Sequence, residues 1–235
     1  MVAAEIQKEL EILADPGHAG ILQRFFKTGP GEYGEGDRFR GIRVPVLRKT
    51  ARKYRDLPLT EAGRLLQSAF HEDRLLALLI LIEQYYRHDD TIRDGIHRFY
   101  LDHSGRVNNW DLVDVSAPHL VGHYLMDRSK DPLTRLAVSR VMWERRMAII
   151  ATFHFIKQGD YDDTLRVARL LLGDPEDLIH KAVGWMLREV GKREVEAAEA
   201  FLQAHYRNMP RTMLRYAIER FPEARRQAYL RGAVV

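Results

Sequence analysis

The chain has 235 residues, of which 46% are hydrophobic and 30% charged, and its formal net charge is +4 at pH 7. This composition is typical of one sizeable folded domain or a solenoid of the same length, and it gives no sign of disorder. The absence of cysteine excludes disulfides, thiol nucleophiles and thiolate metal sites. No apolar run approaches the roughly 20 residues that a membrane helix needs.

The N-terminus carries an acid, Glu5, where the apolar part of a secretory signal would begin. We therefore expect a cytoplasmic protein. The chain has 10 histidines, but none stand at a spacing typical of metal ligands. The sequence predicts neither a metal nor a cofactor.

Apolar residues recur with the helical period along nearly the whole chain, and no segment alternates over a strand length. Proline and glycine supply the breaks between the apolar segments, as at Asp15-Pro16-Gly17 and Gly173-Asp174-Pro175. We expect an all-α protein. The predicted helices lie at about 3–14, 18–27, 45–55, 59–69, 73–87, 90–103, 109–126, 132–139, 142–157, 161–172, 176–190, 194–206, 211–220 and 223–231.

The segment Gly29–Asp37 is rich in glycine and lies between the second predicted helix and a basic region. It differs from a phosphate-cradling loop, because it carries three acids and no Lys-Ser/Thr pair follows it. We expect a mobile surface loop. A role as a lid has no support in the sequence.

Basic residues gather in two regions. Residues 38–55 hold eight Lys or Arg and no acid, and residues 181–235 hold 11 Lys or Arg against 6 Asp or Glu. Two basic regions on either side of a near-neutral middle suit a long polyanion. A solvated helix face explains the same pattern equally well.

The helices repeat at a spacing of about 35 residues. Five small or apolar residues stand in register at steps of 35, 36, 34 and 35: Ala77, Leu112, Ala148, Ala182 and Ala217. This period predicts a single domain over residues 1–235, an α-α superhelix of antiparallel HEAT-like pairs. Equivalent positions in stacked repeats face one surface. Two positions before the register residues, Trp110, Arg146 and Arg215 should therefore form a row.

Trp110 and Asp114 are four residues apart, so they share one helix face. An indole beside a carboxylate could hold a developing cation. The alternative is that Trp110 belongs to the core and that Asp114 satisfies a helix end or an arginine. Trp185 and Arg146, on neighbouring repeats, favour a site, whereas Trp143 is expected to serve packing.

The sequence gives little support for a catalytic histidine or a nucleophilic serine. His119, His123, His154 and His180 stand in apolar or mixed helical segments, where a hydrogen-bonded structural histidine is the favoured interpretation. Serine and threonine show no nucleophile elbow and no acid-base partners at a telling spacing.

Three segments that contain Trp110, Arg146 and Trp185 resemble the AlkD-type DNA alkylation repair glycosylases. They are Trp110-Asp111-x-Val113-Asp114, Arg146-x-Ala148-Ile149 and Lys181-Ala182-x-Gly184-Trp185-x-Leu187-Arg188-Glu189. The segment Gly41-Ile42-Arg43-Val44-Pro45-x-x-Arg48 supports the resemblance from the N-terminal side. Together with the repeat register, the resemblance covers nearly the whole chain, and the Gly184-Trp185 segment is its most specific part.

The resemblance implies a monomeric base excision repair enzyme that holds duplex DNA on a concave solenoid face and excises N3- and N7-alkylated purines. It implies that Trp110 and Trp185 flank the deoxyribose, that Asp114 stabilises the cationic sugar, and that no pocket takes up the base. The DNA-binding residues predicted on this basis are Arg146, Arg188, Arg215, Lys157, Lys181, Arg211, Arg43, Arg48 and Phe25. Phe25 replaces a tyrosine of some members, which removes one hydroxyl contact and leaves the lesion range in question.

The implied reaction is consistent with the charge of the substrate. An N3- or N7-alkylated purine is already cationic, so it leaves as a neutral base without a general acid, and the positive charge passes to the sugar. An ionised Asp114 then needs only to be close, and excision should vary little between pH 6 and 9. The alternative function is a catalytically silent DNA-binding relative or a HEAT-type protein scaffold. The carboxylate between two tryptophans favours the enzyme.

Overall fold

The structure is a computed structural model that describes residues 2–234, and its regular elements are helices. Among these residues, Arg38 and Phe70 form an isolated parallel β-bridge. The prediction of an all-α protein is confirmed. Contacts divide the chain into two compact units, residues 1–116 and 117–235.

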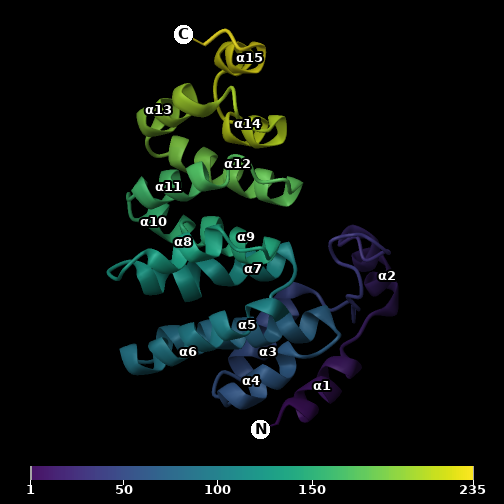
Figure 1. Ribbon diagram of the computed structural model, residues 1–235. Coiled ribbons are helices and arrows are strands. Elements are labelled where there is room, and N and C mark those ends of the chain that lie inside the picture. The colour runs from purple at the N-terminus through teal and green to yellow at the C-terminus, as the bar shows by residue number, and fades with distance from the viewer. Residues whose placement is uncertain (1, 235) are drawn as a thin grey trace. The chain divides into compact units, whose positions relative to one another are not determined.

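The first unit contains α1 (Ala3–Ile12), α2 (Pro16–Phe25), α3 (Val44–Lys53), α4 (Leu59–Leu66), α5 (His71–Arg87), α6 (Asp90–Asp102), the 3₁₀ turn η1 (Ser104–Arg106) and nearly all of α7 (Trp110–Ala117). Its centre is α5, which packs against α3, α4 and α6 (Figure 1). The run from Leu75 to Leu81 is apolar on every side of the helix, and all of it is buried.

The second unit contains the π-helical turn η2 (Pro118–His123), α8 (Asp131–Ala137), α9 (Met142–Ala151), α10 (Phe153–Lys157), α11 (Asp162–Leu170), α12 (Asp177–Gly191), α13 (Val195–His205), α14 (Arg211–Ala217) and α15 (Glu223–Arg231). Its central helix is α12, which packs against α9 on one side and α14 on the other (Figure 1).

Gly184 explains how closely α12 and α14 approach each other. A Cβ atom at this position would lie 2.5 Å from the carbonyl oxygen of Met213 and 2.5 Å from Cβ of Tyr216. Such distances are shorter than real van der Waals contacts, so any larger residue would force the two helices apart. The glycine beside Trp185 is therefore a packing requirement, and it fixes the distance between neighbouring helices in this unit.

Two helices that the sequence predicts as continuous are interrupted. The predicted 109–126 helix changes to π-helical geometry at Pro118, which has no N–H to donate. Downstream, Gly122 allows the carbonyl oxygen of Ala151 to approach within 2.1 Å of its Cβ position. The predicted 142–157 helix breaks at Thr152, whose hydroxyl donates to the Ile149 carbonyl oxygen at 2.7 Å.

The five register residues are all buried, with exposed fractions of 0 to 2%. This is the burial that a stacked repeat requires at its inner positions. Trp143 is buried as well, which confirms its predicted packing role. Within residues 2–234, no helix combines the length and the apolar character of a membrane span.

Candidate functional site

Trp110 is the first residue of α7 and is half-buried in an aromatic cluster of the first unit. Its ring stacks on Phe26, with ring centroids 5.3 Å apart and an angle of 21° between the planes. The ring of Phe25 meets it edge-on at 6.1 Å, and Phe25 itself is 60% exposed. This cluster fixes the indole while leaving an aromatic edge in contact with solvent.

The cluster continues inward to a buried histidine. The ring of Phe39 stacks on Phe26 at 5.0 Å and on His71 at 4.7 Å. His71 Nε2 lies 2.8 Å from Asp111 Oδ2, and its Nδ1 lies 3.4 Å from Asp37 Oδ2. One imidazole thus joins α5, α7 and the end of the glycine-rich segment.

Charge holds His71 in its protonated form. Burial alone would lower its pKa, but the hydrogen bonds to Asp111 and Asp37 outweigh burial and raise the pKa to about 9. Burial likewise favours the neutral form of Asp37, yet bonds from His71 and Asn109 and the charge of Arg74 lower the pKa of this carboxyl. At neutral pH the imidazolium of His71 therefore lies between Asp111 and Asp37, and Asp37 also pairs with Arg74.

Asp37 corrects one expectation about the glycine-rich segment. A mobile surface loop was expected over Gly29–Asp37, but Asp37 is buried and accepts bonds from Arg74 Nη2 at 2.6 Å and Asn109 Nδ2 at 3.2 Å. The neighbouring backbone N–H of Gly34 donates to the Lys27 carbonyl oxygen at 3.1 Å. The C-terminal end of this segment therefore anchors the start of α7 and cannot open as a lid without breaking a buried ion pair.

Glu72, the residue after His71 on α5, holds the Gly41-Ile42 segment in place. Glu72 accepts the backbone N–H groups of Arg40, Gly41 and Ile42 at 2.9, 2.7 and 3.2 Å. Gly41 has φ +84, and a Cβ there would lie 2.0 Å from the Asp15 carbonyl oxygen, so only glycine fits.

The basic region 38–55 contains both buried and exposed arginines. Arg40 is buried, and its guanidinium pairs with Asp73 at 2.7 Å and with Glu11, so it takes no part in a basic surface. Arg43 and Arg48 are exposed, as phosphate contacts must be. Their contact with DNA stays a prediction.

Asp114 lies one turn after Trp110 on the same face of α7 and is half-buried. Asp114 lies close enough to the buried Tyr100 hydroxyl to affect it: burial raises the pKa of Tyr100, and Asp114 raises it further. Tyr100 bonds to Ser116 Oγ at 2.9 Å, on the inner face of the same helix. Both residues lie on α7, as the spacing predicts, and their joint role in a site stays a prediction.

Trp185, on α12, is the centre of a second cluster, within the second unit. Its Nε1–H donates to Glu189 Oε1 at 3.3 Å, and its ring lies 5.8 Å from that of Phe153. The exposed Lys157 stands over Phe153, with Nζ 4.2 Å from the ring centroid. Like Trp110, this indole is half-buried and lies against an aromatic neighbour.

Arg146 is buried, and its Nη1 donates to the Leu178 carbonyl oxygen at 2.6 Å. Arg211 and Arg215 on α14 are exposed. Lys181 pairs with Asp177 at 2.7 Å, and Arg188 pairs with Glu219. The row of Trp110, Arg146 and Arg215 stays a prediction, and the burial of Arg146 counts against its place in a DNA-contacting row.

Two histidines of the second unit are described by their surroundings. His180 Nε2 contacts the Asp174 carbonyl oxygen at 2.5 Å. Burial lowers the pKa of His154 to about 4, and the neighbouring His123 and His119 act in the same direction. Among residues 2–234, no group of three or more His, Cys, Asp or Glu is arranged to hold a metal ion.

Sequence reasoning missed the residues behind Trp110, namely Phe26, Phe39, His71 and Asp37. The polar run His71-Glu72-Asp73 at the head of an apolar helix was the available signal. All three side chains are buried, and each holds a segment distant in sequence.

A model of the DNA alkylation repair enzyme family matches residues 6–221. The chain belongs to the DNA alkylation repair enzyme family. Its fold is similar to a solved structure described as a predicted DNA alkylation repair enzyme from Enterococcus faecalis, with a TM-score of 0.68 and 16% sequence identity. The match covers 89% of this chain and 97% of that one. No curated protein sequence matches the chain.

The residues that match the family model include both tryptophan clusters and the Gly41-Ile42 segment. It ends at Phe221, just before α15. The predicted resemblance to AlkD-type enzymes is confirmed at the level of the family.

Proposed function

We propose that the chain is a DNA glycosylase that removes cationic N3- and N7-alkylated purines from duplex DNA without taking the base into a pocket. The observation that carries the proposal is the arrangement on α7. Trp110 is held by Phe26 and edged by the exposed Phe25, and Asp114 follows one turn later on the same helix face. An indole face and a carboxylate are the two groups that stabilise a developing sugar cation.

The chemistry requires little more from the protein. The alkylated purine departs as a neutral base, so the C1′–N bond breaks without protonation of the leaving group. The bond electrons move to the base, the deoxyribose becomes an oxocarbenium ion, and water then adds to C1′ and loses a proton. In this proposal Asp114 stabilises the ion, Trp110 and Trp185 flank the sugar, and Lys157, Arg43, Arg48, Arg211 and Arg215 hold phosphates.

Release of N7-methylguanine from methylated duplex DNA by the purified protein tests the proposal. We expect free N7-methylguanine and abasic sites in equal amounts. Binding of the same duplex with no base released would make the chain a silent DNA-binding relative instead.

A further inference from the structure

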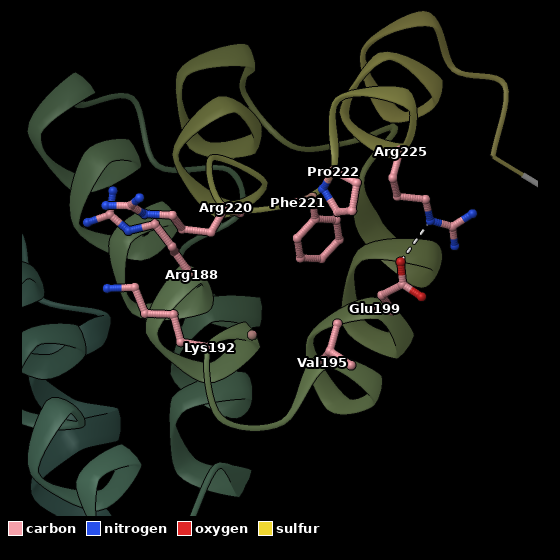
Figure 2. A pocket seen from close by; sticks show the side chains of 10 residues that line it. Arg188, Lys192, Val195, Glu199, Arg220, Phe221, Pro222 and Arg225 are labelled. Carbon is pink, nitrogen blue, oxygen red and sulfur yellow. Dashed lines mark hydrogen bonds and ion pairs between the residues drawn. The ribbon is translucent and has the colours of Figure 1, made fainter.

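A cavity of about 540 Å³ opens between α12, α13 and α15 at the C-terminal end of the second unit (Figure 2). Its volume lies in the range of about 300–1,000 Å³ that is typical of small-molecule sites. The lining residues are Arg188, Gly191, Lys192, Val195, Glu199, Ala217, Arg220, Phe221, Pro222 and Arg225. The lining contains neither tryptophan, and it adjoins the Trp185 cluster only through Lys192, which pairs with Glu189.

The lining has an apolar part and a basic part. Figure 2 shows Phe221 and Pro222 with the basic ends of Arg188, Arg220 and Lys192 to one side. On the other side, Arg225 Nε pairs with Glu199 Oε1 at 2.7 Å. Four cations and one carboxylate line the cavity, so it favours an anionic ligand.

Two of these arginines have bonding capacity to spare. Arg188 pairs with Glu219 through Nη1, but its buried Nε has no hydrogen-bond partner. Within residues 2–234, the guanidinium of Arg220 has no ion-pair partner, whereas Lys192 is paired with Glu189 at 2.6 Å. A buried donor without an acceptor costs free energy, and a bound phosphate oxygen would satisfy it.

The apolar part indicates what accompanies the anion. Phe221 presents an aromatic ring to the cavity, with Pro222 beside it and Val195 across from it (Figure 2). Ala217 is a further apolar residue of the lining. The missing side chain of Gly191 keeps the ring edge free, because a Cβ there would lie 3.5 Å from Cε1 of Phe221. A flat aromatic group attached to a phosphate fits this combination, and a nucleotide is such a ligand.

We propose that this cavity binds a nucleotide, with its phosphate on Arg188 and Arg220 and its base against Phe221. The inference goes beyond base excision, because it adds a nucleotide site outside the two tryptophan clusters. The nucleotide can be free in solution or can be the last, unpaired nucleotide of a DNA strand. Both present the same base and phosphate to the cavity.

Calorimetric titration with dAMP, with deoxyadenosine and with inorganic phosphate tests the ligand class. We expect dAMP to bind at least tenfold more tightly than either of the others, because only dAMP engages both the ring and the arginines. Equal affinity for dAMP and inorganic phosphate would overturn the proposal, since it would show an anion site without base recognition. Equal affinity for dAMP and deoxyadenosine would overturn it too, because the phosphate would then contribute nothing.

Substitutions in the cavity lining test whether dAMP binds there. Arg220→Gln should weaken dAMP binding about tenfold. Phe221→Leu, which keeps the apolar volume but removes the ring, should weaken it by a similar factor. Arg231→Gln, at an exposed α15 residue that does not line the cavity, removes the same charge and should change nothing. Normal affinity in both cavity variants, with their thermal unfolding unchanged, would contradict the proposal.

The source of the nucleotide follows from duplexes with and without a two-nucleotide overhang. If Arg220→Gln weakens only the overhang duplex, the site takes a strand end, whereas weakened dAMP binding with equal duplex affinities indicates a free nucleotide. N7-methylguanine release is measured in parallel. If the wild type binds dAMP but releases no N7-methylguanine, the result would count against the proposed glycosylase activity and leave the nucleotide site intact.

Discussion

His71 Nε2, at the start of α5, lies 2.8 Å from Oδ2 of Asp111, the second residue of α7. The same imidazole stacks on Phe39, and Phe39 stacks on Phe26, which supports the ring of Trp110. His71 therefore positions the tryptophan in two ways, through the helix that carries it and through the rings beneath it.

The first prediction concerns the pH dependence of stability. The pKa of His71 is raised from 6.5 to about 9 in the folded protein. Its stabilising contribution is therefore complete below about pH 6.5 and is lost as the pH rises through about 9, an effect of at most about 3 kcal/mol. The melting temperature of the wild type should fall over this range. His71→Gln should melt lower at pH 6.5 and change less up to pH 9.

His88→Gln is the control for this experiment, since His88 is exposed at the end of α5. It should keep the wild-type pH profile. A wild-type melting temperature that stays constant from pH 6.5 to 9 would contradict a protonated His71.

The second prediction concerns Gly184. Gly184→Ala places a methyl group 2.5 Å from the Met213 carbonyl oxygen, so it should lower the free energy of unfolding by about 1–3 kcal/mol or more. Gly95→Ala is the matched control, because Gly95 lies within α6 with nothing within 4 Å of its Cβ position. The control should be neutral or stabilising by up to about 1 kcal/mol. Denaturant unfolding of both variants measures the difference, and equal stabilities would refute the close α12–α14 contact.

The third prediction separates phosphate binding from folding. Arg215 is exposed, so Arg215→Gln should weaken DNA binding and reduce the salt dependence of log K by about one unit with little change in stability. Arg146→Ala should instead lower stability by about 1–3 kcal/mol, because it removes a buried side chain and the Leu178 carbonyl group loses its donor. Binding titrations across salt concentrations measure the slope. A slope that Arg215→Gln leaves unchanged would remove this residue from the DNA surface.

These variants show what the sequence could and could not predict. The 35-residue register predicted helices whose inner residues, such as Ala148 and Ala182, are fully packed, because a repeat spacing constrains burial directly. Helical spacing alone placed Trp110 and Asp114 one turn apart on one helix, and both lie on α7. His71 and Asp37 were missed, because they are 34 residues apart and meet only through tertiary packing. Arg146 was predicted as a surface contact, but helical periodicity did not show that its side chain is buried.

The fourth prediction concerns lesion range. If excision depends on a base that is already cationic, N3-methyladenine and N7-methylguanine should be released and uracil and hypoxanthine should not. The rate should vary little from pH 6 to about 8, a narrower range than the sequence alone predicts, because His71, with its pKa of about 9, begins to lose its proton above it. Single-turnover assays over this panel measure both effects. Efficient uracil release would reveal a general acid or a base-reading pocket.

The most direct test of the account is the single-turnover rate of N7-methylguanine release by Asp114→Asn, compared with the wild type on the same duplex. This variant keeps the shape of the side chain and removes its charge. The account predicts a rate at least about tenfold lower with DNA affinity nearly intact, because the carboxylate acts on the transition state. Release at the wild-type rate would contradict an electrostatic role for Asp114 and with it the proposed mechanism.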